Sequence, residues 1–377
     1  MNNYLENLNE EQKLPVLHKD GPLIVIAGAG SGKTRVLTYR IIHLINEGVD
    51  PFNILALTFT NKAALEMKNR ISLITSESVS RSIWMGTFHS IFARILRSEA
   101  PLIGYPTNFT IYDTYDSEKL ISNIIKEKKL DKDTYKAKSI KNRISSLKNN
   151  FITVENYFNN SELIEVDKAA RRDLFGEIYQ EYVRRCFKAS VMDFDDLLLK
   201  TNELLNKSPE TLLKYQQKFK YILVDEYQDT NYSQYLIVKA LADRHENLCV
   251  VGDDSQSIYS FRGANIDNIL NFKKHYPNSI SYKLEQNYRS TRNIVQAANS
   301  LINHNILKLD KTIWTDNDVG DKIILNKSLS DSEEGRYVSS NIFELKNNFQ
   351  LNNSSFAVLY RTNAQSRSIE DALRKIN

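Results

Sequence analysis

The sequence predicts an α/β protein whose parallel sheets are covered by helices on both faces. Three observations support this fold class. Short, fully apolar runs recur along the chain, such as residues 23–26 and 221–224, segments with helical periodicity separate them, and a glycine-rich turn joins the first run to a helix. An antiparallel strand with one solvent-exposed face alternates apolar and polar residues. Continuous apolar runs between helices therefore indicate parallel strands that are buried on both faces.

The expected elements follow from this pattern in chain order. Strands are expected at residues 23–26, 54–57, 221–224 and 248–251, and helices follow the first two of them at 36–45 and 63–71. Residues 113–193 are rich in Lys, Glu, Asp and Asn and show helical periodicity without strong strands, which indicates a helical insertion. The α/β pattern then resumes, with helices expected at 293–302, 333–345 and 364–377 and strands at 323–325 and 356–359.

Composition places only broad limits on the class of protein. The chain has 377 residues, a formal net charge of +4 and 2 cysteines. This length can form more than one hydrophobic core, and so small a net charge does not by itself identify nucleic acid as a partner. The cysteines, Cys186 and Cys249, form neither a metal-ligand spacing nor a disulfide framework, which favours a reducing, cytoplasmic location. Neither a signal peptide nor a membrane span of roughly 18 apolar residues is recognisable.

A glycine-rich segment follows the first strand and opens the first helix. It reads Ala27-Gly28-Ala29-Gly30-Ser31-Gly32-Lys33-Thr34. Glycines allow the backbone to approach a phosphate closely, and the exposed N–H groups at a helix N-terminus favour negative charge. Lys33 is expected to reach the β- and γ-phosphates and Thr34 to bind Mg²⁺. The first position of the usual pattern is Gly, where this chain has Ala27, and the alternative is a turn that only joins a strand to a helix.

Two carboxylates, Asp225 and Glu226, directly follow the apolar run at 221–224. Ligands of open α/β sheets bind at the carboxyl ends of the strands. Asp225 is expected to hold Mg²⁺, and Glu226 to orient and deprotonate the attacking water of a phosphoryl transfer. Alone, such a pair is often a solvated strand end, and its combination with the glycine-rich loop favours function.

The acidic pair opens a longer run, Asp225-Glu226-Tyr227-Gln228-Asp229-Thr230-Asn231. Here the chain resembles the UvrD/Rep family of superfamily 1 DNA helicases, whose second motif reads Asp-Glu-(Phe/Tyr)-Gln-Asp-Thr. Other segments resemble the remaining family motifs in the correct order, and the match covers essentially the whole chain: residues 9–12, 59–67, 87–90, 193–197, 252–264, 284–290 and 358–363. One conservative departure is Phe261, because the family commonly has Trp there.

The resemblance implies RecA-like P-loop NTPase domains that use ATP and Mg²⁺. Gln12 would read adenine, since a side-chain amide offers a donor and an acceptor together. Gln256 would sense the γ-phosphate, and Arg289 would act as an arginine finger. The implied catalytic set is Lys33, Asp225, Glu226, Gln256 and Arg289, with Thr34 and Asp225 as metal ligands. The implied nucleotide-binding set is Gln12, Ala27, Gly28, Ala29, Gly30, Ser31, Gly32, Lys33, Thr34, Arg35 and Tyr288.

Single-stranded DNA and duplex junctions are the partners that the resemblance implies. Proteins grip single strands by aromatic stacking and a basic groove, without reading the sequence. The residues expected on the strand path are Phe59, Asn61, His89, Tyr259, Phe261 and Arg262. Residues 136–148 contain Lys138, Lys141 and Arg143 with no acidic residue. That stretch is interpreted either as a solvated helix face or as a phosphate-contacting surface.

The expected domains are a first RecA-like domain at 1–112 and 194–285, a helical insertion at 113–193, and the start of a second RecA-like domain at 286–377. The family's later motifs are not found, so we expect the second domain to be incomplete and the chain alone to lack unwinding activity. The resemblance implies an ATP-dependent helicase that moves 3′ to 5′ in DNA repair or replication. Two alternatives stay open: a DNA-stimulated ATP-binding module without unwinding, and the motor part of a RecB-like helicase–nuclease.

Overall fold

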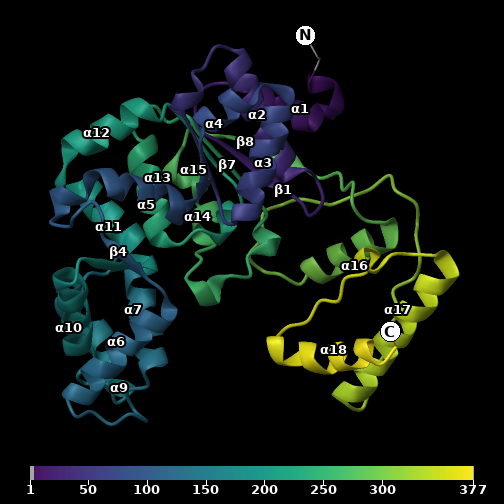
Figure 1. The fold of residues 1–377 in the computed structure, drawn as a ribbon. Coiled ribbons are helices and arrows are strands. Elements are labelled where there is room, and N and C mark those ends of the chain that lie inside the picture. The colour runs from purple at the N-terminus through teal and green to yellow at the C-terminus, as the bar shows by residue number, and fades with distance from the viewer. Residues whose placement is uncertain (1–3, 377) are drawn as a thin grey trace. The chain divides into compact units, whose positions relative to one another are not determined.

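The computed structural model of the chain describes residues 4–376 and the path of the backbone through them (Figure 1). The chain separates into two compact units, with the boundary between Val319 and Gly320. Residues 286–319 therefore belong to the first unit, because the backbone N–H groups of Asn287 and Tyr288 pair with the carbonyls of Trp314 and Gly30. The predicted domain boundary at 285/286 stays a prediction.

A six-stranded sheet forms the centre of the first unit, in the order β3-β2-β6-β7-β1-β8. Every adjacent pair of strands is parallel. The strands are β1 (Leu23–Ala27), β2 (Ile54–Thr58), β3 (Trp84–Thr87), β6 (Tyr221–Val224), β7 (Leu248–Gly252) and β8 (Ile280–Leu284). The parallel α/β fold is confirmed, and the four expected strands of this unit are β1, β2, β6 and β7.

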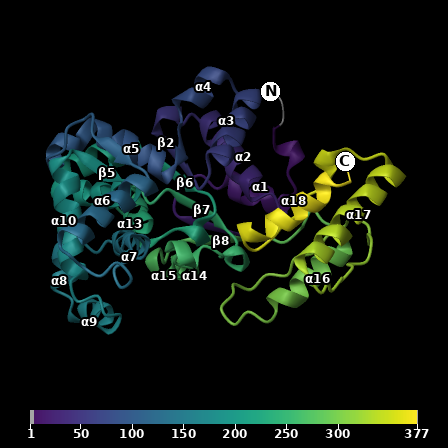
Figure 2. The ribbon, with the colours of Figure 1, turned by 60° about the horizontal axis from the view of Figure 1, so that its bottom comes forward.

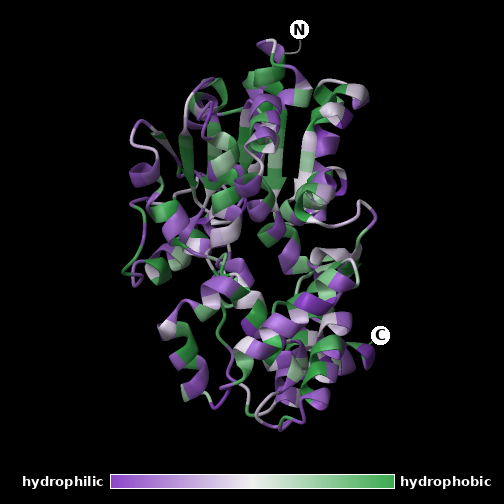
Figure 3. Ribbon diagram, turned by 90° about the vertical axis from the view of Figure 1, so that its left-hand side faces the viewer, coloured by the Kyte–Doolittle hydropathy of each residue, from purple (hydrophilic) through white to green (hydrophobic). Residues whose placement is uncertain are grey.

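Alternate residues of each central strand enter two different hydrophobic cores. Ile24 and Leu55 pack in one core with residues of α5, α11 and α13, whereas Val25 and Ala56 pack in the other with residues of α2 and α3. The two sets of helices therefore cover opposite faces of the sheet. Figure 3 shows its strands as largely hydrophobic ribbons between helices of mixed colour.

Within the described residues, the first unit contains eleven α-helices outside the insertion. They are α1 (Glu10–Leu17), α2 (Lys33–Asn46), α3 (Asn61–Ile74), α4 (Glu77–Ser82), α5 (Phe88–Glu99), α11 (Phe194–Lys207), α12 (Pro209–Lys218), α13 (Tyr232–Ala242), α14 (Asp267–Leu270), α15 (Phe272–His275) and α16 (Arg292–Ile302).

The helical insertion has a core of its own, which includes Ile124, Ile140 and Tyr179. Figure 2 shows the helices of this segment grouped together. Its helices are α6 (Thr114–Glu127), α7 (Ala137–Asn149), α8 (Val154–Phe158), α9 (Ser161–Ala169) and α10 (Phe175–Lys188). The chain enters and leaves the insertion along two paired parallel strands, β4 (Thr110–Tyr112) and β5 (Val191–Asp193).

A buried lysine, Lys148 of α7, ties the insertion to the helix that follows it. Its ammonium lies 2.7 Å from the carboxylate of Asp193 and 2.8 Å from that of Asp196, at the start of α11. Burial opposes the charge on Lys148, and the two carboxylates more than offset it, so its pKa is raised. The insertion is therefore joined to the first domain by an ion cluster as well as by the chain.

The second unit contains the helices α17 (Asp331–Phe349) and α18 (Ser366–Arg374). The strands expected at 323–325 and 356–359 are wrong, because residues 320–376 as described contain no strand. A strand needs a neighbour to pair its backbone groups, and neither segment has one there. Several of their apolar side chains are in solvent, with Ile324 76% and Leu359 94% exposed, whereas Phe356 and Val358 are partly buried.

Both cysteine thiols are buried in the first unit. Burial raises the pKa of Cys186 to about 12 and that of Cys249 to about 11. Neither thiol is poised for nucleophilic chemistry, because a reactive cysteine needs a lowered pKa and access to solvent. Within residues 4–376, no helix is both long and apolar enough to cross a membrane.

Candidate functional site

The glycine-rich loop connects the end of β1 to the start of α2. Gly30 and Gly32 adopt left-handed backbone conformations, with φ of 69° and 89°, and Gly32 caps α2. A Cβ atom on Gly30 would lie 2.7 Å from the amide nitrogen of Asn287 and 2.9 Å from Cβ of Arg289. Both the conformation and the close approach therefore require glycine here. The loop leaves the N-terminal N–H groups of α2 at its centre, which is a geometry suited to phosphates.

Two side chains at the start of α2 meet the two carboxylates at the end of β6. The Lys33 ammonium lies 3.2 Å from Oε2 of Glu226, and the Thr34 hydroxyl donates to Oδ2 of Asp225 at 3.1 Å. Residues almost 200 positions apart in the sequence thus form one cluster, because β1 and β6 end at the same edge of the parallel sheet.

The electrostatics of Asp225 differ from those of an ordinary surface carboxylate. Burial and the neighbouring charge of Glu226 raise its pKa to about 6, and Lys33 and Thr34 oppose this effect. A further cation beside Asp225 would offset the cost of keeping this buried carboxylate ionised. A hydroxyl and a carboxylate oxygen are also hard donors of the kind that Mg²⁺ prefers, so the residues present fit this ion.

Glu226 has an unusual backbone conformation for a non-glycine residue, with φ of 49° and ψ of 45°. Left-handed backbone at a bulky residue is strained and is maintained only by its surroundings. Its carboxylate oxygen Oε2 accepts a hydrogen bond from the Gln228 amide at 2.9 Å. The Glu226 side chain is 35% exposed, so water can reach it.

Gln12 of α1 lies against the glycine-rich loop. Its amide donates to the carbonyl of Ser31 at 2.9 Å, and its Oε1 accepts from the backbone N–H of Asn9. Nearby, the Asn9 amide donates to the hydroxyl of Tyr288 at 2.6 Å. Tyr288 is 48% exposed, so its ring is not part of a hydrophobic core. The structure thus brings Gln12 and Tyr288 to the same side of the loop.

Arg289 and Arg35 also lie near the loop. The backbone N–H of Arg289 donates to Oδ1 of Asn287 at 2.8 Å, and the Asn287 amide donates to the carbonyl of Ala29 at 2.6 Å. Asn287 therefore fixes the segment that carries Tyr288 and Arg289 to the loop. Asn287 lies in the predicted motif at 284–290, directly before Tyr288 and Arg289, and this position was a signal for its role that the sequence analysis missed. The guanidinium of Arg35 lies 5.7 Å from the ring centre of Tyr39.

Gln256 follows β7 and is held by an aspartate. Its amide donates to Oδ2 of Asp253 at 2.6 Å, and the Lys311 ammonium lies 2.9 Å from Oδ1 of the same carboxylate. Lys311 also pairs with Asp254, and its side chain is only 4% exposed. The sequence analysis did not predict a role for Lys311, because this residue lies in no motif. Only the fold brings it next to residues 253–256.

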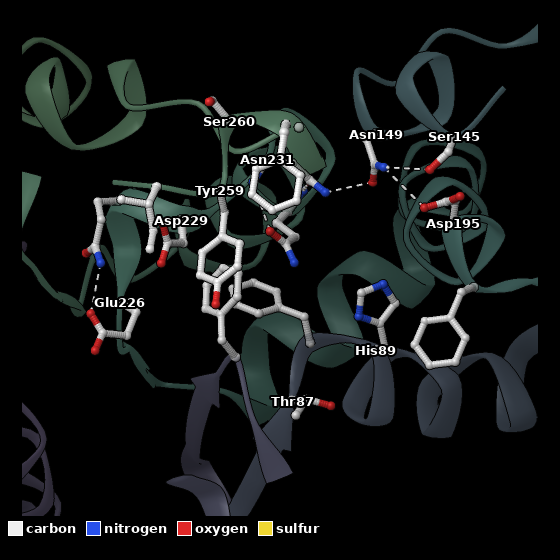
Figure 4. A pocket seen from close by; sticks show the side chains of 18 of the residues that line it. Thr87, His89, Ser145, Asn149, Asp195, Glu226, Asp229, Asn231, Tyr259 and Ser260 are labelled. Carbon is white, nitrogen blue, oxygen red and sulfur yellow. Dashed lines mark hydrogen bonds between the residues drawn. The ribbon is translucent and has the colours of Figure 1, made fainter. Parts of the chain in front are cut away.

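A groove of about 1160 Å³ extends from the acidic cluster to the helical insertion (Figure 4). In Figure 4, Tyr259 points into this space, between Asp229 on one side and His89 on the other. Residues of five predicted motifs line it, including Phe59, His89, Phe194, Glu226, Gln256, Tyr259 and Phe261. The groove therefore connects the expected catalytic base with the expected strand-binding aromatics.

The rings on the groove are arranged in pairs. Tyr259 and Phe261 have ring centres 6.0 Å apart and are 36% and 68% exposed. Phe59 packs against Phe88 with ring centres 5.8 Å apart. His89 lies 4.8 Å from the ring centre of Phe194, and burial lowers its pKa. Exposed rings at a groove are the surfaces on which bases can stack.

One other residue expected on the strand path does not line this groove, and the side chain of a second lies outside what the structure describes. Asn61 is the first residue of α3 and is exposed, but it does not line the groove. Arg262 lies next to the groove residues Phe261 and Gly263, and its side chain is outside what the structure describes.

Residues 136–148, which lie mostly in α7, were interpreted as either a solvated helix face or a phosphate-contacting surface, and the structure gives its cations different surroundings. Ile140, Ile144 and Leu147 are buried in the core of the insertion. Arg143 forms a bidentate ion pair with Asp167 at 3.0–3.2 Å, so its guanidinium already has a partner within the insertion. Lys141 faces the groove. Of the three cations Lys138, Lys141 and Arg143, only Lys141 is among the described residues that line the groove.

Comparison with known proteins places this site in a family. The model of the UvrD/REP helicase N-terminal domain matches residues 8–277, and that of the UvrD-like helicase C-terminal domain matches residues 282–377. The chain belongs to the UvrD/REP helicase family. The resemblance read from the motifs is thus confirmed.

Several curated relatives of the UvrD/REP family are named ATP-dependent DNA helicase PcrA. The relative from Leuconostoc citreum is 47% identical over 371 residues, which cover 98% of this chain and 49% of the relative. That from Bacillus subtilis (strain 168) is 47% identical over 375 residues, covering 99% and 50%. One from Staphylococcus epidermidis is 46% identical over 381 residues, covering 100% and 51%. The chain spans about half the length of the curated relatives it matches.

Proposed function

We propose that this chain is the ATP-hydrolysing and single-strand-binding part of an ATP-dependent DNA helicase. The observation that carries the proposal is the groove, whose lining includes Glu226 and Gln256 at the phosphate loop and Tyr259 and Phe261 near the insertion. Hydrolysis and strand binding are coupled most simply when one surface serves both. The PcrA relatives, which their names describe as ATP-dependent DNA helicases, support the same activity.

The residues would divide the chemistry among them as follows. The loop N–H groups and Lys33 would bind the β- and γ-phosphates, and Lys33 would have to leave Glu226 to do so. Glu226, freed from Lys33, would accept a proton from the attacking water. Arg289 would stabilise charge that develops on the transferred phosphoryl group. Thr34 and Asp225 would hold Mg²⁺, which supplies charge neutralisation when bound.

The nucleotide base would be held on the other side of the loop. Tyr288 offers an exposed ring for stacking on adenine. The Gln12 amide, which now holds Ser31 and Asn9, would have to exchange one of these bonds to read the adenine edge. Arg35 would add positive charge beside the phosphates. Movement 3′ to 5′, a role in repair or replication and a cytoplasmic location are part of the same proposal and rest on the family alone.

Two substitutions test the proposal. Lys33→Ala should abolish ATP hydrolysis by the purified protein, and Glu226→Gln should retain ATP binding while turnover falls by about 10²-fold or more, because the amide keeps the shape and loses the base. Phosphate release with and without oligo-dT is the measurement. Lys207→Ala, an exposed lysine of α11 with a side-chain exposure of 66%, is the control. Parent rates in both variants would overturn the assignment.

A strand-displacement assay separates a helicase from a DNA-stimulated ATPase module. In a protein that carries this chain together with the remaining half of the PcrA relatives' length, a duplex with a 3′ single-stranded tail should be unwound only with ATP, and Lys33→Ala should abolish unwinding. Turnover stimulated by DNA without any strand displacement would instead favour the module.

A further inference from the structure

Gln228 occupies a buried position between the two halves of the proposed site. It belongs to the short helix Tyr227–Asp229 and is 1% exposed. Its amide nitrogen donates to Oε2 of Glu226 at 2.9 Å, and its amide oxygen accepts the backbone N–H of Asp253 at 3.0 Å. Gln228 therefore bridges the end of β6 to the end of β7 through both ends of one amide.

The close fit around Gln228 limits what else could stand there. A Cβ atom on Gly252 would lie 2.6 Å from the amide oxygen of Gln228, so the glycine makes room for the amide. A bridge between a carboxylate and an N–H group needs a donor and an acceptor on one side chain. Glutamine supplies both without a charge. A cation in its place would stabilise the ionised carboxylate more strongly and so weaken it as a base.

The second end of the bridge leads to the strand-binding residues. Asp253, whose N–H bonds to Gln228, also accepts from the Gln256 amide at 2.6 Å. The Ser257 hydroxyl donates to the carbonyl of Gln228. Gln256, Tyr259 and Phe261 line the same groove. A continuous set of hydrogen bonds thus runs from the strand-binding segment to Glu226.

Glu226 has two partners on one oxygen, Lys33 and Gln228. The proposed function requires Lys33 to turn toward phosphate, which leaves Gln228 as the partner that orients the carboxylate. We propose that Gln228 is the positioning residue for Glu226, and that it transmits binding of a single strand at Tyr259 and Phe261 into faster hydrolysis. This inference rests on the proposed function and adds a residue that links its two parts.

The main test is Gln228→Met, which has a similar shape and lacks both hydrogen bonds. Gln228 lines the groove but is 1% exposed, and both ends of its amide are engaged by Glu226 and Asp253, so KM for ATP and Kd for oligo-dT should stay within about twofold of the parent. The DNA-stimulated kcat should fall on the order of 10- to 100-fold, as expected for a misplaced catalytic group. The ratio of stimulated to basal turnover should fall as well.

A second variant separates the two ends of the bridge. Gln228→Glu keeps an acceptor for the Asp253 N–H but places a carboxylate against Glu226. If Gln228 orients Glu226, turnover should fall at least as far as in Gln228→Met. Gln216→Met is the matched control, because the Gln216 amide donates only to the carbonyl of Ala240 at 2.8 Å, away from the groove. It should leave kcat, KM and the stimulation ratio at parent values.

Parent kcat and stimulation in Gln228→Met would overturn the inference. So would a Gln228→Glu variant with parent turnover, and this variant decides the matter if Gln228→Met does not fold. Failure of the proposed function is distinguishable, because Lys33→Ala and Glu226→Gln would then retain turnover whatever Gln228→Met does.

Discussion

Three carboxylates within five residues show how position changes the properties of a side chain. Asp225 is buried against Thr34, Glu226 is partly exposed and paired with Lys33, and Asp229 is 8% exposed with one oxygen that has no hydrogen-bond partner in the protein. Burial and Glu226 raise the pKa of Asp229 to about 6. The motif at 225–231 predicted that its carboxylates would lie in one site, whereas the free-energy cost of burying each carboxylate depends on the fold.

Asp229→Asn should stabilise the protein at neutral pH. The pKa of Asp229 in the folded protein is about 6, above its ordinary value of 3.8. The folded protein therefore keeps the proton of Asp229 to a higher pH than the unfolded chain does, and its free energy of unfolding falls as the pH rises from 3.8 to about 6. Removing the charge should raise the free energy of unfolding by about 1 kcal/mol or more at pH 7. Urea unfolding at pH 7.5 and pH 4.5 is the measurement. The gain should shrink at the lower pH, and an equal gain at both would contradict the assignment.

At the scale of elements, the central strands were predictable and the peripheral ones were not. β1, β2, β6 and β7 are buried on both faces, and their own residues are continuously apolar. β8 lies at the edge of the sheet, and its first four residues, including Ser281 and Lys283, are exposed or partly exposed. β3, at the other edge, is short and contains Gly86. An edge strand pairs on one side only, so its sequence carries a weaker pattern.

Lys148→Met should destabilise the junction between α7 and α11. The substitution leaves Asp193 and Asp196 buried without the cation that lies within 2.8 Å of both. Removing one partner of a buried ion cluster costs about 3–5 kcal/mol. Thermal unfolding followed by circular dichroism should show a clearly lower Tm. Lys138→Met, on an exposed position of the same helix, is the control and should change Tm little. A matching small change in Lys148→Met would show that the cluster adds no stability.

Tyr259→Ala and Phe261→Ala should each weaken single-strand binding by about 1–3 kcal/mol with little dependence on base sequence. Both rings are at least 36% exposed, so their loss should leave Tm nearly unchanged. Fluorescence anisotropy with oligo-dT and a mixed-sequence strand measures the effect. Phe52→Ala removes a ring that is 56% exposed and does not line the groove, and it should bind as the parent does. Parent affinity in both groove variants would show that neither ring stacks on bases.

At the scale of the whole molecule, the two compact units differ in how their backbone groups are satisfied. The first has a six-stranded sheet, whereas residues 320–376 have helices joined by segments without strand pairing. Local stability follows buried contacts and hydrogen-bonded backbone, so the second unit should open more readily.

Amide hydrogen exchange should therefore differ sharply between the units. The amides of β1, β6 and β7 should exchange slowest, since these strands are central and buried. Residues 323–325 and 356–359 should exchange within the earliest time points, because the structure places them in no strand. Mass spectrometry of peptic peptides resolves these segments. Slow exchange at 323–325 and 356–359 would show that they pair in solution and that the strand prediction was right.

The residues of the candidate site that belong to sequence motifs were predicted, and those outside the motifs were not. Lys33, Thr34, Asp225 and Glu226 do converge, because a parallel sheet brings strand ends together. Contacts between distant segments could not be predicted in this way. Lys311 reaches Asp253 and Asp254 only through the path of the chain after α16. Such a contact depends on the tertiary fold rather than on local spacing.

The burial of both native thiols has a practical consequence for labelling. Maleimide dyes react with accessible thiolates, and Cys186 and Cys249 are 2% and 1% exposed with raised pKa values. Cysteines introduced at the exposed positions Glu47 and Lys327 would then take up a donor and an acceptor dye without replacement of either native residue. Energy transfer between the dyes would report the distance between the two compact units in single molecules as nucleotide and DNA are added.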